Sequence, residues 1–99
     1  ALYIVLYDNG NAIAACRYFH QNGVYHIRRV AIVKEYRGKQ LGNEIMNIAE
    51  FEIKKECGEK IEVSAQFRVK EFYKKLGYKE VGEIYFDEYC EHITMVKEL

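Results

Sequence analysis

The sequence contains no proline and no long hydrophobic run, and it carries no net charge, because 15 basic residues balance 15 acidic ones among 99. A balanced chain has no overall field that attracts nucleic acid or a membrane surface, so any anion site must be local. No apolar run approaches the roughly 20 residues of a transmembrane helix. The first residues also lack the basic flank of a signal peptide. We therefore expect a cytoplasmic protein.

Cysteine is scarce as well. Cys16, Cys57 and Cys90 are widely spaced and include no CxxC pair. An odd, scattered set argues against a disulfide framework and against a zinc site, so we expect free thiols and no metal. Two phosphate motifs are also missing, since neither GxxxxGK[ST] nor GxGxxG occurs.

The residues that are present suit one small domain. A chain of this length buries roughly two-thirds of the surface that it exposes when unfolded, and 49% of the residues are hydrophobic. Apolar periodicity and turn residues predict three strands, a helix, a strand, a second helix and two final strands, which is a mixed α/β (α+β) fold. These elements are expected at residues 2–7, 12–20, 24–33, 41–57, 60–64, 68–76, 78–85 and 91–96.

The connections predict how the strands are arranged. Asn-Gly pairs, which are strong hairpin signals, join the first three strands, so these should form an antiparallel meander. The strand at 60–64 follows a crossover helix and should run parallel to the strand at 24–33. The continuous apolar run at 30–33 predicts that this end is buried on both faces of the sheet. Gly58 and Gly77 are expected to end the two helices.

A glycine-containing turn at residues 37–43 joins the third strand to the first helix. A helix start presents unpaired N–H groups, and the helix dipole adds positive potential at the same point. Gly38 and Gly42 let the backbone approach a ligand without a Cβ in the way, while Arg37 and Lys39 add positive charge. The turn therefore predicts a phosphate site, although many such turns are plain structural connections.

Three blocks of sequence resemble the GNAT superfamily of acyl-CoA N-acyltransferases, and in particular its ElaA-type branch. The turn resembles the pyrophosphate motif [QR]-x-x-G-x-[GA], with Arg37 and Gly42 in place and Gln40 where the motif has glycine. Residues 72–78, FYKKLGY, resemble the family's FYxxxG[FY] block. The block that resembles the ElaA-type branch comprises residues 63–66, Glu83 and residues 91–95.

The resemblance implies an enzyme that moves an acetyl group from acetyl-CoA to a primary amine, by direct attack in a ternary complex and without a metal. The acceptor would be a small molecule or a protein. The backbone of Val30, Ala31 and Ile32 would pair with the pantetheine arm and polarise the thioester carbonyl. The coenzyme's diphosphate would bind the turn residues Arg37, Gly38, Lys39, Gln40, Leu41, Gly42 and Asn43.

The resemblance also implies two catalytic residues. Tyr73 would protonate the departing thiolate, because a phenol is protonated at neutral pH. His92 is the implied general base and His26 an alternative, although a lone histidine in a strand is more often structural. Cys90 is expected to be a small hydrophobic residue, since no base is spaced to activate it. Three glutamates are expected either to be solvated or to hold an acceptor cation or a relay water: Glu83, Glu88 and Glu91.

Several alternatives stay open. GNAT domains usually begin with a strand and two helices that form a wall of the acceptor site, whereas residues 1–99 are expected to form a single domain without them. Either the chain is a fragment, or a neighbouring copy in a homodimer supplies the wall, or the site is open.

Two rival functions also stay open: a non-catalytic CoA-binding or regulatory module, and a nucleic-acid-binding domain. Zero net charge counts against the second. Four cations near the second helix form a solvated face or reach the ribose phosphate of CoA: Arg68, Lys70, Lys74 and Lys75.

Overall fold

Three strands joined by two tight turns begin the computed structural model, which describes residues 2–87 and 89–99. They are β1 (Leu2–Asp8), β2 (Asn11–Gln21) and β3 (Val24–Ile32). Each pairs with the next in antiparallel fashion, which confirms the predicted meander. Both Asn-Gly turns have positive φ at both residues, as hairpin turns of the primed type require.

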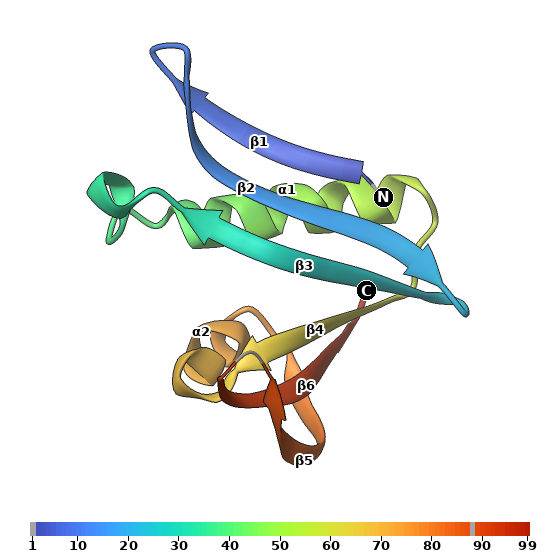
Figure 1. Ribbon diagram of the computed structural model, residues 1–99. Helices are drawn as coiled ribbons and strands as arrows, with labels where there is room; N and C mark the ends of the chain where they lie inside the picture. The colour runs from blue at the N-terminus through green and yellow to red at the C-terminus, as the bar shows by residue number, and fades with distance from the viewer. Residues whose placement is uncertain (1, 88) are drawn as a thin grey trace.

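The rest of the chain alternates helices with strands. In order, the elements are the 3₁₀ turn η1 (Lys34–Tyr36), α1 (Leu41–Lys55), β4 (Lys60–Gln66), the 3₁₀ turn η2 (Phe67–Val69), α2 (Lys70–Lys75), β5 (Lys79–Asp87) and β6 (Cys90–Glu98). The sheet has the strand order β1-β2-β3-β4-β6-β5 (Figure 1). Among the described strands only β3 and β4 are parallel neighbours, as predicted. The helix α2 starts later than predicted, because the 3₁₀ turn η2 precedes it. No helix in the described residues is long and apolar enough to cross a membrane.

The sheet parts between β3 and β4. Residues 25–27 of β3 pair with residues 61–63 of β4, and then the strands diverge, so that the two halves of the sheet spread apart (Figure 1). A β-bulge accompanies the divergence: Arg29 and Val30 of β3 face the single residue Cys16 of β2, and Arg29 has a φ of 58°. A bulge bends its strand and increases the local twist, so this one turns β3 away from β4.

The parting overturns one prediction. The apolar run at 30–33 is not buried on both faces, because β4 no longer pairs with β3 there. Ala31 is exposed, and Val33 keeps 39% of its surface. Val30 and Ile32 pack against the core from one side only. This end of β3 therefore presents an unpaired backbone edge to the space between the two halves.

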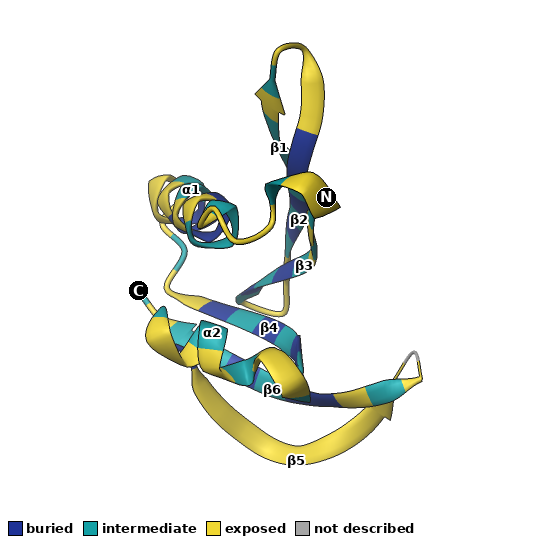
Figure 2. Ribbon diagram, turned by 90° about the vertical axis from the view of Figure 1, so that its left-hand side faces the viewer, coloured by how far each residue is buried: buried dark blue, intermediate teal, exposed yellow. Residues whose placement is uncertain are grey.

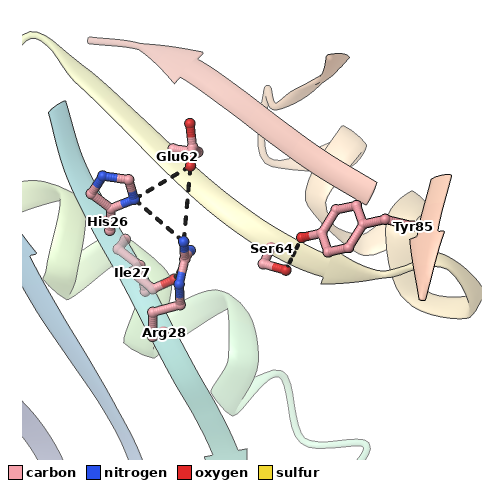
Figure 3. Close-up of polar contacts among 6 residues, drawn as sticks. All are labelled: His26, Ile27, Arg28, Glu62, Ser64 and Tyr85. Atoms are coloured by element: carbon pink, nitrogen blue, oxygen red, sulfur yellow. Dashed lines mark hydrogen bonds and ion pairs between the residues drawn. The ribbon is translucent and has the colours of Figure 1, made fainter. Parts of the chain in front are cut away.

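Both helices cover the same face of the sheet. α1 packs across β2 and β3, α2 contacts β4, and side chains from both helices join one apolar core. Figure 2 shows buried segments on α1 and on the central strands, whereas β5 is exposed along its whole length. The opposite face carries alternate residues of β3 and β4, among them His26, Arg28, Glu62 and Ser64 (Figure 3). No helix of the described residues covers that face.

A buried carboxylate connects the two halves on the helix side. Glu50 of α1 is only 8% exposed. Its carboxylate accepts a hydrogen bond of 2.8 Å from the Tyr78 hydroxyl and lies 2.9 Å from Lys97 Nζ of β6. Tyr78 follows Gly77, which ends α2 as predicted with a φ of 100°. Because a buried charge is tolerated only when it is partnered, these contacts hold α1 against the far half of the sheet.

The end of α1 differs from the prediction. The helix ends at Lys55, and Cys57 rather than Gly58 takes the left-handed conformation, with a φ of 66°. The amide of Cys57 donates to Lys54 O and that of Gly58 to Ile53 O, both at 2.9 Å, which are the two bonds of a Schellman motif. Gly58 is required by space, because a Cβ there would lie 2.4 Å from Ile53 Cγ2.

We expect Gly58→Ala to lower the free energy of unfolding by about 1–3 kcal/mol, the usual cost of overpacking. The added methyl group would displace Ile53 or the Tyr25 ring, which lies 2.9 Å away. Cys57→Gly should raise the free energy of unfolding by about 0.5–1 kcal/mol, since glycine adopts the left-handed conformation without a steric cost. Urea denaturation measures both changes, and a Gly58→Ala chain as stable as the parent would contradict the packing argument.

Candidate active site

The turn between β3 and α1 borders a cleft of about 820 Å³, whose other wall includes Phe72 and Lys75. The amides of residues 38–43 donate no backbone hydrogen bond within the described residues, whereas the amide of Glu44 donates to Gln40 O at 3.1 Å. The start of α1 thus presents free N–H groups, and its dipole favours an anion at this point. The predicted turn residues that line the cleft are Arg37, Gly38, Gln40, Leu41, Gly42 and Asn43.

The cleft is locally basic. Arg37 and Lys75 line it, and no carboxylate of the described residues does. The Arg37 Nε–H donates to Ile32 O at 3.2 Å, which ties the turn to the end of β3. Lys39 does not line the cleft, although its ammonium group lies 5.2 Å from the centre of the ring of Tyr36, which does. An anion in the cleft would therefore meet Arg37 and Lys75 first.

The four cations near α2 divide between the two alternatives drawn from the sequence. Lys74 and Lys70 form ion pairs with Glu80, at 2.7 and 3.6 Å, and so belong to a solvated face. Lys75 lines the cleft beside α1, and Arg68 lines a second cleft. The sequence alone could not separate these pairs, because the register of β5 decides which lysines reach Glu80.

Two glycines and one glutamine shape the turn. Gly38 has a φ of 82°, and a Cβ there would touch nothing. Gly42 allows α2 to approach, since a Cβ there would come 3.1 Å from the Phe72 ring. Gln40, which replaces the motif's glycine, also has a left-handed φ, of 65°, and this costs about 1 kcal/mol for a residue with a Cβ. Its Oε1 accepts a hydrogen bond of 2.7 Å from Asn43.

The parting of β3 and β4 opens the second cleft, of about 860 Å³. Its lining brings together three groups that lie far apart in the sequence: residues 30–32 of β3, Tyr73 of α2 and His92 of β6. Ile32 and Arg37 border both clefts, so the two adjoin. An elongated ligand can therefore reach from the start of α1 into the gap in the sheet.

The backbone at Ile32 faces this gap. The amide of Val33 donates to Ile13 O at 2.9 Å, toward β2. Successive amides of a strand point in opposite directions, so the N–H of Ile32 points away from β2, toward the open edge. The edge has the geometry to pair with an extended ligand as an added strand.

Tyr73 lies between the core and the second cleft. Its ring makes edge contacts with Phe72 and Tyr78, at centroid distances of 5.0 and 5.9 Å. Burial raises the pKa of Tyr73, the neighbouring Cys16 raises it further, and Arg28 acts in the opposite direction. The phenol is therefore neutral near pH 7 and can donate a proton or a hydrogen bond into the cleft.

His92 is buried, with 7% of its surface exposed, and stacks against the Tyr85 ring at a centroid distance of 5.9 Å. Its Nδ1 lies 3.1 Å from Cys90 O and 3.8 Å from Cys90 Sγ. Because a carbonyl oxygen only accepts, we assign the proton to Nδ1, which leaves Nε2 as the acceptor. A histidine therefore lies beside Cys90, but a protonated Nδ1 cannot activate the thiol, and this agrees with the expectation that no base is spaced to do so.

His26 does not line the second cleft. It stacks on Phe19 at 5.0 Å, and its Nδ1 lies 3.4 Å from both Glu62 Oε2 and Arg28 Nη2 (Figure 3). Burial lowers the pKa of His26, while the Glu62 carboxylate acts in the opposite direction. Sequence analysis did not single out Glu62, because its place beside His26 depends on the register of β3 against β4.

The remaining candidates that the structure describes line neither cleft. Glu83 and Glu91 are exposed, in agreement with the expected solvation, and Glu88 lies outside the described residues. The three cysteines are free thiols, and burial raises the pKa of Cys16 to about 11. Of the described residues among them, none lines the second cleft.

Residues 1–99 match the sequence pattern of the family described as acetyltransferase (GNAT) domain. The chain belongs to the GNAT acetyltransferase family. This match confirms the family, the fold and the N-acetyltransferase class that the sequence blocks predict.

Related proteins agree with the assignment. YjcF of Bacillus subtilis (strain 168), an uncharacterized N-acetyltransferase, is 29% identical over 97 residues, which are 97% of this chain and 69% of YjcF. The crystal structure of Escherichia coli ElaA has a TM-score of 0.90 at 25% identity, over 97% of this chain and 67% of ElaA. A GNAT family acetyltransferase from Elizabethkingia anophelis, solved with acetyl-CoA bound, has a TM-score of 0.85 at 12% identity, over 98% of this chain and 75% of that one. The last likeness shows the fold alone.

The left-handed conformation of Gln40 leads to a stability prediction. Gln40→Gly should raise the free energy of unfolding by about 0.5–1 kcal/mol, because glycine removes the steric cost of the left-handed φ. Asn43→Ala is the matched control, since it removes the same side-chain hydrogen bond without changing that φ, and its effect should stay within about 0.5 kcal/mol. Thermal and urea unfolding measure both, and a destabilised Gln40→Gly chain would refute the argument.

Proposed function

We propose that this GNAT domain transfers the acetyl group of acetyl-CoA to a primary amine by direct attack in a ternary complex. The observation that carries the proposal is the junction of the two clefts at Ile32 and Arg37. An anion site at a helix start opens there into a gap that holds a free strand edge, a neutral phenol and an imidazole. The family and the acetyl-CoA bound by the Elizabethkingia relative support acetyl-CoA as the donor.

The coenzyme would lie along both clefts. Its diphosphate would accept hydrogen bonds from the free amides of residues 38–43, with Arg37 and Lys75 supplying charge. The pantetheine arm would pair with residues 30–32, and the N–H of Ile32 would polarise the thioester carbonyl as an oxyanion-type donor. A main-chain site of this kind depends on backbone geometry more than on side-chain identity, so it tolerates Gln40 in place of glycine.

The chemistry would use the two side chains that line the gap. The amine nitrogen attacks the carbonyl carbon, the carbon–sulfur bond breaks, and the amine loses a proton. His92 Nε2, the free acceptor of the imidazole, takes that proton directly or through a water. The Tyr73 hydroxyl donates to the departing thiolate, which leaves as the thiol of CoA.

A cytoplasmic location, pairing with a second copy and the choice between a small-molecule and a protein acceptor stay predictions. The rival function is a non-catalytic CoA-binding module, for which Gln40 in the place of the motif's glycine is the argument. Release of CoA from acetyl-CoA in the presence of an amine panel separates the two, because the module would bind acetyl-CoA without any turnover.

Arg37→Glu should weaken the binding of CoA by about tenfold or more, since a charge-assisted hydrogen bond contributes about 1.5–3 kcal/mol. Lys55→Glu, an equal charge change at the far end of α1, is the control and should change the dissociation constant less than about twofold. Isothermal titration calorimetry with CoA measures both. Equal losses for the two variants would remove the phosphate role from the turn.

Tyr73→Phe should lower kcat by about 10²-fold or more, the usual contribution of general acid catalysis, while acetyl-CoA affinity stays nearly constant. Because burial raises the pKa of Tyr73, the loss of its proton should reduce activity only above about pH 10, the unperturbed value of tyrosine. Tyr7→Phe, exposed on β1, is the control. Unchanged single-turnover rates in Tyr73→Phe would exclude the residue from the mechanism.

A further inference from the structure

The second cleft holds every arginine of the chain. Its lining includes all five, and the other ten of the 15 basic residues are lysines, none of which lines it. Arginine differs from lysine in its planar fork of donors, which matches the two oxygens of a carboxylate or a phosphate. In a chain without net charge, this separation of arginine from lysine indicates an anion site in the cleft. The five are Arg17, Arg28, Arg29, Arg37 and Arg68.

Two of these arginines oppose each other on the sheet. Arg17 of β2 and Arg28 of β3 are register partners on the face opposite the helices. Like charges directly opposite each other destabilise a strand pair, and Arg29 of the bulge lines the same cleft. Locally unfavourable arrangements such as two opposed like charges usually occur at functional sites. An anion bound among the three would turn the repulsion into attraction.

The nearby carboxylates leave this cluster positive. Arg28 Nη2 lies 3.9 Å from Glu62 Oε2 (Figure 3), and Asp87, exposed on β5, is the one carboxylate of the described residues that lines the cleft. Arg17 Nε is buried and has no hydrogen-bond partner among the described residues, while its guanidinium carbon lies 5.4 Å from the centre of the Phe19 ring. A buried donor without a partner is costly, and an anion in the cleft would offset this cost by pairing with the guanidinium charge.

We propose that the acceptor amine carries an oxyanion group, a carboxylate or a phosphate, which Arg17 and Arg28 bind on the open face of the sheet. This inference rests on the proposed acetyl transfer and narrows its acceptor to anionic amines. The phosphates of the coenzyme have their own site at the start of α1, on the helix side. The anion of the acceptor would hold its amine in the same cleft as Tyr73 and His92, where the thioester is expected.

Two matched pairs of amines test the inference by the rate of thiol release from acetyl-CoA. β-Alanine is compared with β-alaninamide, and O-phosphoethanolamine with ethanolamine, at a pH where the fractions of free amine are known. We expect kcat/KM, corrected for free amine, to be about tenfold or more higher for an anionic member than for its neutral partner. The better of the two anionic amines identifies the group as a carboxylate or a phosphate. Equal rates within both pairs would overturn the inference and leave the acetyl transfer intact.

Arginine variants test the assignment of residues. Arg17→Gln and Arg28→Gln should each raise KM for the anionic amine about tenfold or more, with kcat, the rate for the neutral amine and the affinity for acetyl-CoA nearly unchanged. Lys79→Gln, exposed on β5, is the control and should change none of these. Weaker acetyl-CoA binding with an unchanged KM for the amine would mean that these arginines serve the coenzyme, which contradicts the inference.

Two measurements do not depend on turnover. Arg17→Gln should leave the midpoint of thermal unfolding unchanged or raise it, because it removes one of two opposed like charges, whereas a purely structural role predicts a lower midpoint. The Nε–H resonances of Arg17 and Arg28 should shift when β-alanine or O-phosphoethanolamine is added to the CoA-bound chain. A shift without acetylation of any amine would refute the proposed acetyl transfer but support the anion site. The absence of a shift would refute the anion site.

Discussion

The parting of β3 from β4 after three paired residues is the constraint on which the rest of the structure depends. Neighbouring strands normally satisfy each other's backbone groups, so an open edge in the middle of a sheet needs a cause and a support. The bulge at Arg29 supplies the cause by bending β3. The support comes from Glu50, whose contacts to Tyr78 and Lys97 join α1 to the other half of the sheet. Both clefts exist because the two halves are held together at one end and apart at the other.

Local costs are concentrated around this opening. Arg29 and Gln40 hold left-handed φ values, Arg17 opposes Arg28, and the amides of residues 38–43 are left free. Each of these features is unfavourable without a ligand, and an anion or an extended backbone in the opening would compensate the opposed charges and the free amides. The tight turns with Asn-Gly pairs and the satisfied carboxylate of Glu50 show that the same chain follows the local rules elsewhere.

Much of this arrangement is visible in the sequence, since hairpin turns, helical periodicity and the turn at residues 37–43 are local signals. The rest depends on long-range register. A single extra residue at Arg29 decides which side chains share a face and whether residues 30–33 are covered, and no local pattern marks it. The C-terminus of α1 is a second feature that the sequence does not predict. Gly58 is the residue expected to take the left-handed conformation, but Cys57 takes it. Gly58 is required because a Cβ at this position would clash with Ile53. The pairing of Arg17 with Arg28 likewise needs the register of β2 and β3.

The two faces of the sheet divide the work of a transferase. On the helix side, main-chain amides and Arg37 line the cleft proposed for the phosphates of the donor, and on the open side Arg17 and Arg28 line the cleft proposed for a second anion. The free edge of β3 and the hydroxyl of Tyr73 lie between them, where the donor and the acceptor would meet. Two anions approaching the same point repel each other, so separate cations on opposite faces of the sheet are what would allow both to bind at once. A neutral chain can bind two anionic ligands in this way because its arginines, and not its net charge, determine the local potential.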